Sequence, residues 1–163
     1  MLRSSPIYKR EVRLRAVHDD MVPPRLFGSR TVLLRGLLNL VSNALKFTSK
    51  GHVTVHTSLL SVPDAQTQRV RIDVVDTGCG MGEREMVEAR QPYVRGRFNG
   101  RSTGLGLGLP IVIACIDRAG GKFQMDSTPG LGTRCSFELD FMRDDPLGGV
   151  PNTPKGMGPS HEK

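Results

Sequence analysis

The sequence predicts a two-layer α/β sandwich, in which helices cover one face of a mixed β-sheet. Two patterns lead to this fold class. Residues 11–17 and 133–141 alternate apolar with polar or charged side chains, which is the period of a half-exposed strand, whereas residues 31–47 repeat leucine and valine at helical spacing. At 163 residues, the chain has the length of one domain.

Proline and glycine pairs separate the expected elements. A pair of prolines at 23–24 precedes the first long helix, a pair of glycines at 120–121 ends the last helix, and a Pro-Gly pair at 129–130 forms a turn. In chain order we expect strands at 11–17, 53–60, 70–75, 122–127 and 133–141, and helices at 31–47, 83–89 and 109–118.

Shifts in composition mark the expected domain boundaries. We expect an N-terminal extension at 1–10, a folded domain at 11–142, and a tail or linker at 143–163 that has too few apolar residues to order itself. Within the domain, residues 91–103 combine glycine, proline and arginine without a regular period. This composition predicts a mobile loop.

The composition argues against several classes of protein. No apolar run approaches the roughly 20 residues of a membrane span, and no apolar segment follows the N-terminus as in a secretory signal. Cys79, Cys115 and Cys135 lack metal-binding spacing, and an odd number of cysteines argues against a disulfide framework. We therefore expect a cytoplasmic location, with any membrane attachment made through other domains.

The net charge of +7 allows two interpretations. One is a basic surface for nucleic acid. The other, which we prefer, is positive charge gathered around a polyphosphate pocket and on an exposed sheet face. The sequence has no basic stripe interleaved with the aromatic side chains that stack on bases, so we expect no direct nucleic-acid partner.

The first long helix combines a narrow polar stripe with a broad apolar side. Asn39, Asn43 and Lys46 share one sector of the helix. Two amides and an ammonium one turn apart can hold a metal ion through an amide oxygen and a phosphate through the ammonium. An ordinary solvated face is the alternative interpretation. The opposite side, which we expect to dock on the sheet, holds Leu34, Leu37, Leu38, Val41, Ala44 and Leu45.

Two glycine-containing motifs follow this helix. Asp76 ends the strand at 70–75 and precedes Gly78 and Gly80. A carboxylate there can accept a hydrogen bond from the exocyclic amine of adenine, and glycines let the backbone approach the ring. A plain turn is the alternative interpretation.

The second glycine motif leads into a helix, where free backbone N–H groups can bind phosphates. It consists of Gly104, Gly106 and Gly108, with Leu105 and Leu107 between them. Its spacing fits neither the Walker loop nor the dinucleotide fingerprint. The interleaved leucines predict a loop that packs down rather than a flexible hinge.

Together the motifs resemble the N, G1 and G2 boxes of histidine kinases, a branch of the Bergerat-fold (GHKL) ATPases. The N box is matched by Asn39 to Thr48, G1 by Asp76 to Met81, and G2 by Gly104 to Gly108. Residues 91–96 resemble the F box and ATP lid of that family, and residues 128–133 resemble the turn before its last strand. The resemblance covers roughly residues 11–141.

This resemblance implies a set of site residues and cofactors. Asn43 would hold Mg²⁺ and Lys46 would contact the phosphates of ATP, these two being the catalytic residues, and Asp76 would read adenine. Arg95 or Arg97 in the lid would meet the γ-phosphate. The wider nucleotide site implied comprises Asn39, Gly78, Gly80, Met81, Arg95, Gly104, Leu105, Gly106, Leu107, Gly108 and Thr133.

The implied activity is transfer of the γ-phosphate from Mg-ATP to a histidine on a separate dimerisation or phosphoacceptor domain. A downstream response regulator is the further partner implied. Two features depart from the family pattern. Residues 89–91 lack the aromatic that usually precedes the F box, and no acceptor domain precedes residue 11. His161 lies in the expected tail, and we interpret its histidine-box context as coincidence.

Other functions remain open at this point. An ATP-hydrolysing clamp of the gyrase, chaperone or mismatch-repair type places a glutamate one turn before the metal-binding asparagine, where this chain has Asn39, a poor general base. A non-catalytic nucleotide-binding regulatory module is another possibility. Phosphorylation of serine, as by the anti-sigma kinases, is a related alternative.

Overall fold

The computed structural model describes residues 11–92 and 108–144, and within them the chain forms a mixed six-stranded sheet with three helices. The strands are β1 (Glu11–His18), β2 (Leu26–Phe27), β3 (Lys50–Ser61), β4 (Thr67–Asp76), β5 (Lys122–Thr128) and β6 (Gly132–Arg143), and the helices are α1 (Arg30–Phe47), α2 (Glu83–Ala89) and α3 (Gly108–Arg118). No helix in this described part is both long and apolar enough to cross a membrane.

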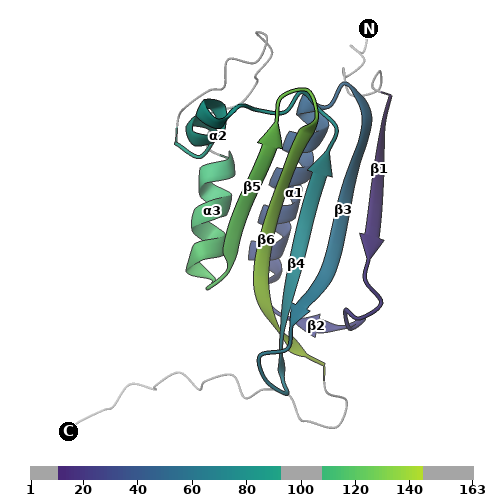
Figure 1. Ribbon diagram of the computed structural model, residues 1–163. Coiled ribbons are helices and arrows are strands. Elements are labelled where there is room, and N and C mark those ends of the chain that lie inside the picture. The colour runs from purple at the N-terminus through teal and green to yellow at the C-terminus, as the bar shows by residue number, and fades with distance from the viewer. Residues whose placement is uncertain (1–10, 93–107, 145–163) are drawn as a thin grey trace, which may run out of the picture.

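The sheet has one parallel pair and is otherwise antiparallel. β1 runs parallel to β3, and β3, β4 and β6 follow as antiparallel neighbours. On its other side, β6 pairs first with β5 and then, at its far end, with β2. Helices α1 and α3 lie against the same face of the sheet (Figure 1). The predicted two-layer α/β sandwich is therefore confirmed.

The hydrophobic core lies between the sheet and these two helices. Phe137 on β6 and Ile116 on α3 are fully buried at its centre. On α1 the buried residues are Gly36, Leu40 and Ala44, which are spaced four apart. A side chain at position 36 would crowd the Phe137 ring, since an added Cβ would lie 3.2 Å from Phe137 Cζ. Glycine therefore lets α1 approach the sheet closely.

The sheet-facing side predicted for α1 was partly wrong. Leu38 is 65% exposed and Leu34 is 36% exposed, while Gly36, which is not among the residues expected to face the sheet, is buried. The apolar residues of α1 cover more than half of its circumference, so the apolar pattern alone did not fix the line of contact. The short strand β2 was missed, because two residues carry no measurable period.

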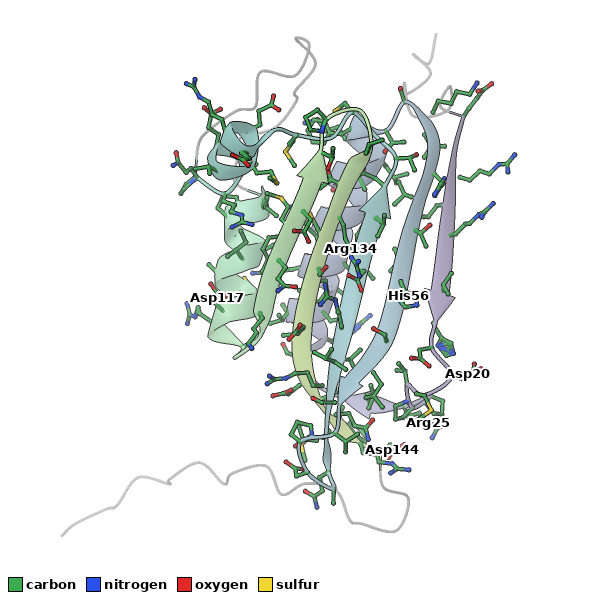
Figure 2. The ribbon with its side chains drawn as sticks, viewed as in Figure 1. Asp20, Arg25, His56, Asp117, Arg134 and Asp144 are labelled. Carbon is green, nitrogen blue, oxygen red and sulfur yellow. The ribbon has the colours of Figure 1, made fainter. Side chains whose placement is uncertain are left out.

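A polar network occupies the helix-free face of the sheet. The carboxylate of Asp73 on β4 accepts hydrogen bonds from Arg134 at 2.8 Å, Ser136 at 2.7 Å and Arg71 at 3.2 Å. Figure 2 labels Arg134, which belongs to this network on β6. Although burial opposes ionisation, these hydrogen bonds outweigh it and hold the pKa of Asp73 below its usual range.

Candidate nucleotide site

Segments distant in the sequence meet at one end of the sheet. The arrowheads of β4 and β5 lie at the end where α2 is found (Figure 1). Asp76, the last residue of β4, is the register partner of Thr133 on β6. The C-terminus of α1 reaches the same place, since the N–H of Cys79 donates to the carbonyl of Phe47 at 3.4 Å. The first and second sequence motifs are therefore neighbours.

Asp76 is a buried carboxylate with a defined orientation. It is 8% exposed, and its Oδ1 accepts backbone N–H donors from Gly78 at 2.8 Å and Thr133 at 3.3 Å. Both hydrogen bonds given by the described residues reach Oδ1, which leaves Oδ2 as the oxygen for a ligand. Burial raises the pKa of Asp76, and these two hydrogen bonds only partly offset that effect.

The glycines after Asp76 are required by close backbone contacts. An added Cβ at Gly78 would lie 2.5 Å from the carbonyl oxygen of Phe47. At Gly80 it would collide with the carbonyl of Thr128, and the backbone there has a positive φ of 64°. The backbone of the loop after β4 therefore packs closely against both the end of α1 and the end of β5. No larger side chain fits at either position.

A serine that the sequence analysis did not identify joins this loop to the turn between β5 and β6. Ser127 Oγ accepts the N–H of Met81 at 2.8 Å, donates to the carbonyl of Gly132 at 3.0 Å, and lies 2.8 Å from Thr133 Oγ1. Sequence reasoning missed Ser127 because a lone serine near a strand end carries no pattern. Thr133, which the resemblance includes in the nucleotide site, lies next to Asp76.

The polar stripe of α1 faces the start of α3. Asn43 Nδ2 donates to Asn39 Oδ1 at 3.1 Å, so the amide oxygen of Asn43 is left to act as an acceptor or metal ligand. At Gly108, the first residue of α3, an added Cβ would collide with Asn39 Nδ2. Asn39 and Asn43 are both only partly exposed. This geometry brings the first motif against the end of the third.

Lys46 and Thr48 complete the end of α1. Lys46 Nζ lies 5.2 Å from the centroid of the Phe47 ring, a cation–π distance. The Thr48 N–H donates to the carbonyl of Ala44 at 3.0 Å and ends the helix. Thr48 is fully buried, and within the described residues its hydroxyl has no hydrogen-bond partner.

Several predicted site residues cannot be placed in this arrangement. Gly104, Leu105, Gly106, Leu107 and the lid arginines Arg95 and Arg97 lie outside the described residues. The residues that the structure does bring together at this end of the sheet are Asn39, Asn43, Lys46, Asp76, Gly78, Gly80, Met81, Gly108, Ser127 and Thr133.

Comparisons with known proteins agree with this geometry. Residues 28–143 match the family model described as histidine kinase-, DNA gyrase B-, and HSP90-like ATPase. The sensor protein TorS of Escherichia coli is 33% identical over 132 residues, an alignment that covers 81% of this chain and 14% of TorS. The chain spans between 8% and 15% of the length of the curated relatives it matches first.

Two solved structures extend this result. Full-length ShkA, determined in complex with AMPPNP, matches with a TM-score of 0.67 and 27% identity, over 80% of this chain and 26% of that chain. A nucleotide-free catalytic domain of the histidine kinase ThkA matches with a TM-score of 0.63 and 26% identity, over 82% of this chain and 81% of that chain. The chain therefore belongs to the family of histidine kinase-, DNA gyrase B- and HSP90-like ATPases, as an ATP-binding catalytic domain of the sensor histidine kinase type.

Proposed function

We propose that this chain binds Mg-ATP and donates the γ-phosphate to a histidine on a separate phosphoacceptor domain. The observation that carries the proposal is the buried carboxylate of Asp76, whose Oδ1 is held by two backbone N–H groups while Oδ2 faces no donor among the described residues. An acceptor fixed in this way suits the exocyclic amine of adenine. Gly78 and Gly80 keep the adjacent backbone free of side chains.

The polar stripe of α1 supplies the second half of the proposal. Asn43 would hold Mg²⁺ through its amide oxygen, because its amide nitrogen is already engaged by Asn39. When bound, the ion neutralises phosphate charge. Lys46, at the end of the same helix, would contact the phosphates as a point charge. Both residues are positioned by the packing of α1 against the sheet and α3.

The segment between α2 and α3 is positively charged. Residues 93–107 contain three arginines and no aspartate or glutamate. A segment of this charge, anchored on one side at the start of α3, suits the terminal phosphates of a nucleotide. We propose that Arg95 or Arg97 contacts the γ-phosphate.

Transfer to an acceptor is favoured over hydrolysis by the position of Asn39. Activation of water requires a general base near the γ-phosphate, and Asn39 is an amide whose oxygen accepts from Asn43. In-line transfer relies instead on positioning and on charge neutralisation. The nucleophile would come from the acceptor domain, and a cytoplasmic response regulator would be the next partner.

Nucleotide binding is tested with two substitutions, Asn43→Ala and Asp76→Asn. Asn43→Ala should abolish the Mg²⁺-dependent part of ATP affinity. Asp76→Asn should weaken ATP and ADP binding alike, because it replaces the free Oδ2 with an N–H donor. The measurement is calorimetric titration with and without Mg²⁺, with the exposed neighbour Ser42→Ala as control. Wild-type affinity for ADP and Mg-ATP in both variants would contradict the site.

Phosphotransfer is tested by mixing the chain with isolated phosphoacceptor domains and ATP labelled at the γ-phosphate. We expect label on the acceptor that is lost in acid and stable in alkali, as for phosphohistidine. Acid-stable label would indicate transfer to serine. Tight ATP binding without transfer to any acceptor would favour a regulatory nucleotide-binding module.

A further inference from the structure

The hydroxyl of Ser127 lies at the centre of a hydrogen-bond network beside the adenine end of the proposed site. Its three partners are the N–H of Met81, the carbonyl of Gly132 and the hydroxyl of Thr133, at 2.8, 3.0 and 2.8 Å. Ser127 and Thr133 are both half-buried. The network therefore connects the loop after β4 with the turn between β5 and β6.

Proton counting fixes the direction of each hydrogen bond. A serine hydroxyl has one proton and two lone pairs. The carbonyl of Gly132 can only accept and the N–H of Met81 can only donate, so the single proton of Ser127 goes to Gly132. The remaining lone pair of Ser127 must then accept the proton of Thr133. The hydroxyl of Thr133 has no proton left to donate elsewhere.

The position of Thr133 makes this direction relevant to ligand choice. Its backbone N–H donates to Asp76 Oδ1 at 3.3 Å, so the two residues are neighbours. With its proton engaged by Ser127, Thr133 Oγ1 offers only lone pairs, as the carboxylate of its neighbour Asp76 does. A purine with an amine at that edge has protons for these acceptors. A purine with a carbonyl at that edge would bring its oxygen lone pairs against those of Thr133 and Asp76, which is repulsive.

We propose that Ser127 is a positioning residue that sets base specificity: by taking the proton of Thr133, it keeps that hydroxyl an acceptor and so favours adenine over guanine. The inference rests on the proposed nucleotide function and deepens it. Ser127 does not itself contact the base. It acts by orienting the hydroxyl of Thr133. Its hydrogen bond from the N–H of Met81 also holds the loop that contains Gly78 and Gly80.

The test compares the affinities for ADP and GDP, without Mg²⁺, by competition titration of the full chain. Ser127→Ala frees the Thr133 proton, so the preference for ADP over GDP should fall about tenfold, the effect of one hydrogen bond. Ser127→Thr keeps the hydroxyl and should restore the preference. Ser136→Ala is the matched control, because Ser136 is a buried serine that bonds Asp73 on the helix-free face.

An unchanged preference in a folded Ser127→Ala variant would overturn the inference. If that variant does not fold, Thr133→Val carries the test, since it leaves the bonds of Ser127 to Met81 and Gly132 in place. A preference that survives Thr133→Val would equally overturn it. Absence of ADP binding by the wild-type chain would instead overturn the nucleotide site itself, and the inference with it. The two failures are therefore distinguishable.

Discussion

At the scale of single residues, the site depends on backbone approach as much as on side-chain chemistry. Gly80 and Gly130 both have a positive φ, at 64° and 79°. Only Gly80 also faces a neighbouring backbone, the carbonyl of Thr128, whereas nothing lies within 4 Å of a Cβ added at Gly130. Substitution at Gly130 therefore measures the cost of the left-handed backbone alone. Substitution at Gly80 measures that cost together with the steric clash.

We predict that Gly130→Ala destabilises the fold by about 1–2 kcal/mol, the cost of a left-handed backbone for an L-residue. Gly80→Ala should cost more than this, because the loop must also move away from β5. Chemical denaturation of both variants measures the difference. Equal losses of stability would show that the contact with Thr128 does not hold the loop.

At neutral pH the buried carboxylate of Asp76 is expected to lower the free energy of unfolding, although the same carboxylate serves as an acceptor for the ligand. Its pKa is raised by burial, so its contribution to stability is present below the unfolded pKa and is lost as pH rises through the folded pKa. At pH 7 the fold therefore holds a carboxylate whose ionised form burial disfavours.

We predict that Asp76→Asn melts at a higher temperature than the wild-type chain at pH 7, while binding adenine nucleotides more weakly. The gain in melting temperature should disappear as the pH is lowered towards 3.8, the ordinary pKa of aspartate, because the wild-type carboxyl then takes up its proton. Thermal melts at several pH values measure this. A variant less stable than wild type at pH 7 would contradict the assignment.

At the scale of elements, the pairing of β4 with β6 is supported from both faces. Apolar side chains of the two strands meet in the core, among them Ile72 and Phe137, which are register partners. On the opposite face, the carboxylate of Asp73 accepts hydrogen bonds from Arg71, Arg134 and Ser136. Because Asp73 is almost completely buried, its removal leaves these donors without their shared acceptor.

We predict that Asp73→Ala lowers the free energy of unfolding by about 2–3 kcal/mol, the range for hydrogen bonds to a charged group. The melting temperature should fall by roughly 5–10 °C. Because the pKa of Asp73 is lowered in the folded state, this stabilisation is present above pH 3.8, the ordinary pKa of aspartate. It is lost as pH falls through the folded pKa. Differential scanning calorimetry at neutral and acid pH checks both points. The ratio of ADP to GDP affinity should not change, since the network lies on the other face.

At the scale of the whole molecule, one end of the sheet gathers segments from across the chain. The end of α1, the loop after β4, the start of α3 and the turn between β5 and β6 are in contact there. In the proposed function, the nucleophile is supplied by a separate acceptor domain.

We predict that the chain alone hydrolyses ATP at a rate near background, because Asn39 cannot act as a general base. Steady-state phosphate release, measured with and without an acceptor domain, tests this. The control is Asn43→Ala, which should show the same background rate. A partner-independent rate that Asn43→Ala removes would favour the ATP-hydrolysing clamp instead.

The sequence by itself determined the fold class, because strand and helix periods are local properties that tertiary contacts here did not override. It also determined the candidates Asn43, Asp76 and Gly108, because each lies in a motif of fixed spacing. The helix α2 was predicted with its observed bounds, Glu83–Ala89. Most other boundaries moved by one to three residues, since the pairing of strands extends them beyond the apolar core.

Only the tertiary structure decided which side of α1 meets the sheet and which residue orients Thr133. Gly36 is buried because Phe137, a hundred positions later in the chain, fills the space above it. Ser127 matters because strand register pairs it with Thr133, while the loop after β4 brings the N–H of Met81 to its hydroxyl. The contacts of Gly36 with Phe137 and of Ser127 with Met81 join residues far apart in sequence, and local periodicity carries no information about them.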